Sequence, residues 1–293
     1  MYNQISSNIW KSYGLILFFI VIIVGLGYLF TQVTGYPEIL PLAVIFAILS
    51  SIGSYYYSDK IVLTMSHARL ASKEEYPHLV NSVEGLAIAA GLPMPKVYVI
   101  DDSAPNAFAT GRNPQHAALA VTTGLLDKMD RVELEGVIGH EMSHIKDYDI
   151  RLMTLVAILV GIVVLISDWL MRSMWFGSRR NNNREGGGNP IVLVVAIAAA
   201  IIAPLAATLI QLAVSRKREY LADAEGALLT RYPDGLASAL EKIASDNEPL
   251  EVANKATAHM YICNPLHDHG GWLNSLFSTH PPLEERVARL RAM

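Results

Sequence analysis

Five consecutive residues, His140-Glu141-Met142-Ser143-His144, carry the pattern H-E-x-x-H, whose spacing suits metal chemistry. On a helix, residues four apart lie on one face, so His140 and His144 can bind a single metal ion. Glu141, between them, can take a proton from a water held by that metal. Two histidines on a solvated helix face fit the same spacing, so the flanking sequence decides between the two interpretations.

The flanking sequence predicts a helix whose histidines lie beside a buried face. Asp130, followed by Glu133, is typical of a capped helix N-terminus. Four apolar residues then recur at helical spacing and form a stripe: Leu134, Val137, Ile138 and Ile145. Gly136, one turn before His140, would let another segment approach closely. This pattern favours a ligand pair at the edge of a cleft.

A catalytic zinc site needs a third protein ligand, with the fourth position left to water. The metzincin pattern is excluded, because it requires glycine where this chain has Asp147 and histidine where it has Ile150. Downstream, Glu219 and Asp223 are four apart and so share a helical face. One carboxylate can bind the metal while the other accepts a hydrogen bond from a ligating imidazole. Taken alone, the same pair also fits a charged helix surface.

Several ordered motifs resemble the HtpX family of membrane zinc endopeptidases, which are relatives of the type I CAAX prenyl proteases. The matching segments are H-E-M-S-H, the later run E-Y-L-A-D-A from Glu219, and Ser278-Thr279-His280-Pro281-Pro282. The segment Asn106-Ala107-Phe108-Ala109-Thr110-Gly111 also looks like a family element. The resemblance runs from the first hydrophobic stretch to the C-terminus.

The resemblance implies an α+β, mostly helical fold: multi-pass membrane helices that carry a gluzincin-type zinc metalloprotease domain with an active-site helix and a small β-sheet. It implies one zinc ion per chain, bound by His140, His144 and Glu219, with Asp223 supporting a ligating histidine. Glu141 would then be the general base. His280 could steady the developing oxyanion, with Arg286 supporting it, although a structural role for His280 fits equally well.

Composition independently favours a membrane protein, because 52% of residues are hydrophobic and only 17% are charged. Residues 13–30 and 39–57 are long and apolar enough to span a bilayer. Residues 190–214 form a third candidate, since a membrane helix tolerates its internal Pro204. Residues 152–169 are shorter and include Asp168, so they can either span or lie in the interface. No small-x-small cleavage site follows the first stretch, so we do not expect a cleavable signal peptide.

The topology must leave the His140 and Glu219 helices on the same side of the membrane, so the two late stretches are predicted to act as a pair. We therefore divide the chain into two transmembrane helices (1–57), the first part of the catalytic domain (58–150), a hydrophobic hairpin with a basic loop at 177–189 (151–214), and the second catalytic part (215–293). Basic residues beside the catalytic parts favour a cytoplasmic site, the basic loop argues against it, and the resemblance implies the cytoplasm.

Several local elements are predicted around these parts. Residues 76–90 read as a helix ended by Gly91, and residues 97–100 and 117–121 as strands. Between the strands, Asn106, Ala107, Phe108 and Ala109 are expected from the resemblance to form an edge strand that holds an extended peptide through main-chain hydrogen bonds. An ordinary loop is the alternative. A short amphipathic helix is expected around Leu283, Val287 and Leu290.

Two further residues could be mistaken for site residues. The single Cys263 excludes an internal disulfide and suits a reducing compartment, and we expect it to be a small apolar residue rather than a nucleophile. His259 is expected to be buried and hydrogen-bonded rather than a metal ligand.

The predicted function is hydrolysis of peptide bonds in membrane or misfolded proteins, as membrane quality control under stress, at the cell (inner) membrane. The expected partners are protein substrates and the lipid bilayer. The net charge of −4 gives no indication of nucleic acid, and the oligomeric state is not indicated. A CAAX-like prenyl protease is an alternative, but it implies a larger chamber of spans. A non-catalytic chaperone or scaffold would not need Glu141, and an ion conductor using Asp168 would not explain His140, His144 and Glu219.

Overall fold

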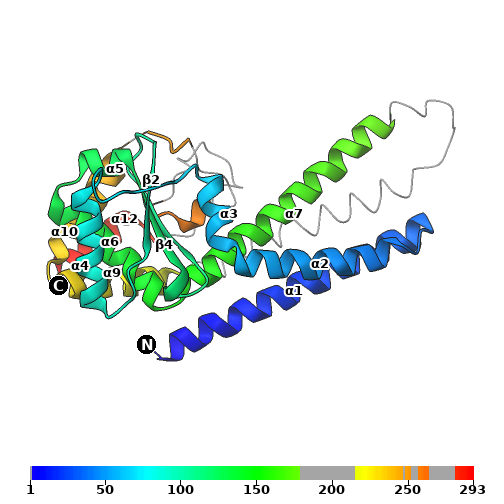
Figure 1. Ribbon diagram of the computed structural model, residues 1–293, viewed down its shortest axis with the longest axis horizontal. Coiled ribbons are helices and arrows are strands. Elements are labelled where there is room, and N and C mark those ends of the chain that lie inside the picture. Colours follow the sequence, from blue (N-terminus) through cyan, green and yellow to red (C-terminus); the bar gives the residue numbers. More distant parts are fainter. Residues whose placement is uncertain (1, 179–214, 247, 252–256, 264–280) are drawn as a thin grey trace.

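The computed structural model describes residues 2–178, 215–246, 248–251, 257–263 and 281–293. Three long helices, α1 (Tyr2–Thr34), α2 (Ile39–Tyr56) and α7 (Asp149–Ser178), extend from a compact part that contains the sheet and the remaining helices (Figure 1). The observed architecture is mostly helical with one small mixed sheet, as the sequence predicts.

Helices α1 and α2 are the two described helices that are long and apolar enough to cross a membrane. They include the predicted span 13–30 and all of the predicted span 39–57 except its last residue. Large apolar side chains on both helices face outward, with exposed fractions of 61–64% at Leu17, Val21, Leu42 and Leu49. Such a continuous exposed apolar surface is costly in water and suits a lipid environment.

Helix α7 continues without a break through the weaker hydrophobic stretch, and its first turns pack against α1. Leu152, Leu155 and Leu159 of α7 form one apolar cluster with Leu15, Phe19 and Ile23 of α1. Whether residues 152–169 cross the membrane stays a prediction. The predicted span 190–214 and nearly all of the basic loop lie outside the described residues.

The four-stranded sheet has the order β1-β2-β4-β3. Its strands are β1 (Arg69–Leu70), β2 (Lys96–Ile100), β3 (Ala107–Gly111) and β4 (Ala117–Thr122). β2 and β4 are parallel, whereas β1 pairs antiparallel with β2 and β3 antiparallel with β4. The predicted strands are confirmed, and the segment between them is a strand at the edge of the sheet.

Seven further helices complete the described fold of the compact part: α3 (Ser58–Met65), α4 (Pro77–Ala90), α5 (Thr123–Lys128), α6 (Arg131–Lys146), α9 (Arg216–Thr230), α10 (Pro233–Ser245) and α12 (Leu283–Arg291). The predicted helix end at Gly91 is confirmed, since Gly91 adopts a left-handed conformation with φ 67°. Short 3₁₀ turns occupy Pro114–His116 and Ala258–Met260.

Helix α6 is the central element, in contact with α4, α9, α10 and β3. Its start is the predicted capping box, in which the Asp130 carboxylate accepts from the Glu133 amide and the Glu133 carboxylate accepts from the Asp130 amide. The predicted apolar stripe is buried, with Val137, Ile138 and Ile145 fully inaccessible. Burial of this stripe anchors α6 in the core and fixes which face presents the histidines.

Two glycines let neighbouring helices lie against α6. A Cβ atom at Gly136 would lie 2.6 Å from the backbone nitrogen of Leu236 in α10, which is the close approach predicted for this glycine. A Cβ at Gly226 in α9 would lie 2.8 Å from the backbone nitrogen of His140. The absence of side chains at these positions brings elements of 58–150 and 215–293 together.

Candidate metal centre

Three side chains from two helices converge beside the edge of the sheet. Helix α6 supplies His140 and His144, and α9 supplies Glu219 at its first turn. Their ligand atoms all lie within 4.8 Å of one another, and all three residues are buried. The two Nε2 atoms are 3.2 Å apart, and the Glu219 carboxylate oxygens lie 3.8 Å from His140 Nε2 and 3.7 Å from His144 Nε2.

The donor set fits a metal ion. Bonds of about 2.0–2.1 Å in a tetrahedral zinc site place neighbouring ligand atoms roughly 3.4 Å apart, close to the three separations observed here. Two imidazoles and a carboxylate are also a ligand combination of catalytic zinc sites, which leave one position open for water. These residues could therefore hold one metal ion with an exchangeable fourth position.

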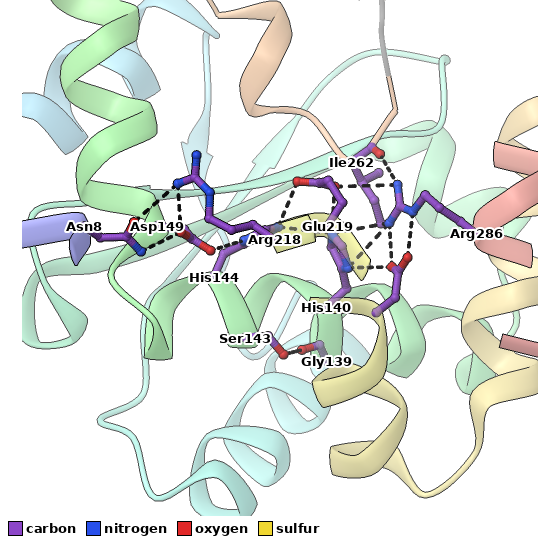
Figure 2. A network of polar contacts seen from close by, with 11 residues as sticks. Asn8, Gly139, His140, Ser143, His144, Asp149, Arg218, Glu219, Ile262 and Arg286 are labelled. Carbon is purple, nitrogen blue, oxygen red and sulfur yellow. Dashed lines mark hydrogen bonds and ion pairs between the residues drawn. The ribbon is translucent and has the colours of Figure 1, made fainter. Parts of the chain in front are cut away.

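The first imidazole is supported entirely by the compact part of the molecule. His140 Nδ1 lies 3.0 Å from Asp223 Oδ1. Arg286 of α12 in turn donates to both oxygens of Asp223, from Nε at 2.9 Å and from Nη2 at 2.7 Å. Arg286 Nη1 also donates to the Ile262 carbonyl at 2.9 Å (Figure 2). Donation from Nδ1 to Asp223 would leave the His140 Nε2 lone pair available to a metal.

The second imidazole is supported by residues that reach the first long helix. His144 Nδ1 lies 3.1 Å from Asp149 Oδ2 at the start of α7. The other oxygen, Asp149 Oδ1, accepts from Arg218 Nη1 at 3.0 Å and from Asn8 Nδ2 at 2.7 Å (Figure 2). Each candidate histidine is therefore backed by an aspartate, and each aspartate by an arginine.

Burial sets the electrostatics of the site. Burial raises the pKa of Glu141 to about 7, against the opposing charge of His144. It lowers the pKa of His140, which favours the neutral imidazole that a metal requires. Burial also acts to lower the pKa of His144, but the hydrogen bond to Asp149 and the charge of Glu219 outweigh it and raise that pKa to about 9.

The predicted peptide-binding strand lies beside the metal centre, and part of its outer edge is paired with the segment around Ile262. All five residues of β3 are buried. The Ala107 carbonyl accepts from the Ile262 amide at 3.0 Å, and the backbone of Ala109 lies beside the Glu141 carboxyl group and acts to lower its pKa. Asn106 Nδ2 donates to the Cys263 carbonyl at 3.3 Å. The strand is thus an edge in the sheet order, and its Ala107 carbonyl is paired with the Ile262 amide. Peptide binding by Asn106, Ala107, Phe108 and Ala109 stays a prediction.

The other residues that the sequence analysis considered, beyond the metal ligands and the β3 strand, have different positions relative to the metal centre. Arg286 is fully buried and its described contacts are with Asp223, Ile262 and the His140–Glu219 pair, so it lies behind the metal centre. His280 lies outside the described residues, and its role with Arg286 stays a prediction. His259 is buried and its Nε2 lies 3.0 Å from the Met153 carbonyl, as expected. Cys263 is buried, which raises the pKa of its thiol to about 12.

The sequence interpretation missed three residues of this network: Asn8, Arg218 and Asp149 in its supporting role. Asp149 follows His144 closely enough to be found, because a carboxylate just beyond a ligating helix is a common partner of an imidazole. Asn8 gave no local signal: it is 141 positions away from Asp149, and only the packing of α1 against α7 brings the two together.

Comparison with known proteins agrees with this geometry. The model of Peptidase family M48 matches residues 73–293. A protein of Dictyoglomus turgidum named "Protease HtpX homolog" is 49% identical over 296 residues, spanning 100% of this chain and 94% of the relative. A protein with the same name from Thermoanaerobacter pseudethanolicus is 47% identical, spanning 100% of this chain and 98% of the relative. Another from Pyrococcus furiosus is also 47% identical, spanning 97% of this chain and 96% of the relative.

A solved structure shares the fold. The structure titled "Crystal Structure of S. mikatae Ste24p" aligns with a TM-score of 0.51 at 20% identity, covering 99% of this chain and 67% of that one. The family model covers most of the chain and includes both helices of the metal centre. This chain belongs to Peptidase family M48.

Proposed function

We propose that this protein is a membrane-embedded zinc endopeptidase that cleaves peptide bonds in membrane or misfolded proteins. The observation that carries the proposal is the position of Glu141: it is buried between two histidines whose Nε2 atoms are 3.2 Å apart and which share the carboxylate of Glu219. The proposed zinc ligands are His140, His144 and Glu219. A purely structural role would not require an acid at this point.

The roles of the side chains follow from their contacts. A bound zinc ion would polarise the substrate carbonyl and lower the pKa of water at its open position. Glu141, whose pKa burial raises to about 7, is suited to take the proton from the attacking water and to pass it to the leaving amine. Asp223 and Asp149 hold the two imidazoles with their Nε2 atoms directed inward. Arg286 neutralises Asp223 and positions it.

Substrate binding along β3 is the natural extension of this geometry, because Ala109 lies next to Glu141 and an extended peptide can pair with a strand edge. The Ala107 carbonyl already accepts a hydrogen bond from the Ile262 amide. A peptide that pairs with this carbonyl must therefore first displace the segment around Ile262. Main-chain pairing tolerates many sequences, which suits an enzyme that removes diverse damaged proteins. The proposed substrate-binding residues are therefore Asn106, Ala107, Phe108 and Ala109.

The proposed location is the cell (inner) membrane, with α1 and α2 as spans and the catalytic part in the cytoplasm. The paired-span topology of 151–214 and the divisions at 57, 150 and 214 belong to the same proposal. A protease-protection assay would locate each segment. Tags at the N-terminus and in loop 177–189 are digested only if they lie on the side of a sealed vesicle that the added protease can reach. A loop on the same side as the metal centre would exclude the paired-span topology.

The proposed chemistry is tested with Glu141→Gln. The amide cannot accept a proton but leaves the three proposed ligands intact, so zinc content should stay at one ion per chain while casein cleavage falls to background. Cleavage of a prenylated CAAX peptide is measured in parallel. Cleavage of this peptide in place of casein would indicate the alternative, a CAAX-like prenyl protease. Near-normal casein cleavage by this variant would exclude Glu141 as the general base, and wild-type protein that binds no zinc would exclude the metal assignment.

A further inference from the structure

We infer that Asn8, in the N-terminal helix α1, is a positioning residue of the metal centre that acts on His144 through Asp149. The inference rests on the proposed zinc site. It means that the first membrane helix is part of the catalytic apparatus and does more than anchor it.

The side-chain amide of Asn8 makes its described hydrogen bonds with residues around Asp149. Asn8 is 2% exposed, and its Nδ2 donates to Asp149 Oδ1 at 2.7 Å and to the Asp147 carbonyl at 2.9 Å. Its Oδ1 faces Arg218 Nη1 at 3.5 Å. A buried amide with donors and acceptor all directed at one cluster is held in a single orientation.

Those two donations hold both sides of the connection between α6 and α7. Helix α6 ends at Lys146 and α7 begins at Asp149, so only Asp147 and Tyr148 join them. Tyr148 adopts a left-handed conformation with φ 61°, which is costly for a residue with a side chain and must be stabilised by its surroundings. By binding the backbone before Tyr148 and the carboxylate after it, Asn8 fixes the direction in which Asp149 faces His144.

Other contacts hold α1 in place independently of Asn8. Leu15 and Phe19 share an apolar cluster with Leu152 and Leu155 of α7, and the Arg151 guanidinium carbon lies 4.8 Å from the centroid of the Tyr13 ring and 4.9 Å from that of the Tyr55 ring. Removing the amide of Asn8 should therefore leave α1 seated. The effect of Asn8 on the metal can then be separated from the effect of helix packing.

The test measures zinc affinity of the full-length protein in detergent, by competition with a chelator, in a Glu141→Gln background that removes the proposed peptidase activity. Asn8→Ala should weaken zinc binding by about 10-fold, the lower end of the range for residues that support a ligand from outside. Leu15→Ala is the matched control: it loosens the packing of the same helix without removing a hydrogen bond to Asp149, and zinc affinity should be unchanged.

A double-mutant cycle separates positioning from general structure. If Asn8 acts through Asp149, then Asn8→Ala should have no further effect on zinc affinity once Asp149→Ala is present. Additive losses would overturn the inference, as would equal losses for Leu15→Ala and Asn8→Ala, or an unchanged affinity for Asn8→Ala. Wild-type protein that fails to bind zinc at all would instead exclude the proposed function, so the two failures are distinguishable.

Discussion

The two imidazoles of the candidate metal centre are supported by networks of similar composition that end in different places. Behind His140, Asp223 and Arg286 both belong to the compact part, and the Arg286 side chain is 0% exposed. Behind His144, the carboxylate of Asp149 is shared between Arg218, whose side chain is 11% exposed, and the neutral amide of Asn8 from a membrane helix. One support is closed within the compact part, whereas the other reaches helix α1.

The difference suggests a division of labour between the two supports. A bidentate arginine–carboxylate pair is strong and geometrically restrictive, so the Asp223 side holds one ligand rigidly. The Asp149 side spreads its hydrogen bonds over two donors, so each donor matters less. Because one of these donors is Asn8 of α1, a hydrogen bond from the first long helix contributes to the position of the second ligand.

The largest expected effect comes from removing the buried arginine. Arg286→Met leaves Asp223 as a buried carboxylate without its guanidinium partner, which should cost about 3–5 kcal/mol of the free energy of unfolding. Arg218→Met leaves Asp149 with its donor Asn8, so we expect a smaller loss of about 1.5–3 kcal/mol. Thermal unfolding of the zinc-free full-length variants in a Glu141→Gln background measures both.

Equal losses from the two arginine variants would contradict the distinction between a closed and a shared support. A larger loss for Arg218→Met would reverse it and would make the Asp149 side the rigid one. Both variants should keep α1 packed on α7, because neither residue belongs to that apolar cluster.

The parts of the site that depend on local spacing were predictable from sequence. Helical periodicity alone pairs His140 with His144 and Glu219 with Asp223, and the capping pattern at Asp130 located the start of α6. The long apolar runs of α1 and α2 were equally clear. Each of these features is encoded within one or two turns of a helix.

Features that depend on packing between distant segments could not be predicted in the same way. Nothing near Asn8 indicates that it meets Asp149, and nothing near Ala107 indicates that the Ile262 amide covers its carbonyl. The position of β3 at the end of the sheet favours a free edge, whereas its Ala107 carbonyl is paired with the Ile262 amide. Contacts of this kind become visible only once the helices and strands are arranged in space.

An intermediate effect is expected from filling the contact between α9 and α6. In Gly226→Ala the new Cβ would lie 2.8 Å from the His140 backbone nitrogen, so α9 must move away from α6. Overpacking of this kind costs about 1–3 kcal/mol, and the shift also moves Glu219 away from His140. We expect reduced thermal stability together with weaker zinc binding.

The matched control for this variant is Gly85→Ala in α4, where a Cβ meets nothing within 4 Å. There we expect a gain of about 0.5–1 kcal/mol from helix propensity and unchanged zinc affinity. If Gly226→Ala also gained stability and bound zinc normally, the close contact of the two helices would not be what positions Glu219.

The smallest expected effect distinguishes a buried arginine from an exposed one on the same helix. Arg289 of α12 lies three positions after Arg286, with its guanidinium carbon 3.8 Å from the centroid of the Tyr220 ring and its side chain 53% exposed. An exposed cation–π contact contributes about 0.5–1 kcal/mol, so Arg289→Ala should lower stability by no more than this and leave zinc affinity unchanged. Arg289→Lys should restore most of the small loss, since lysine keeps the cation. If Arg289→Ala instead destabilised the protein as much as Arg286→Met, then the docking of α12 as a whole, and not the buried Arg286–Asp223 pair, would account for the rigidity of the His140 side.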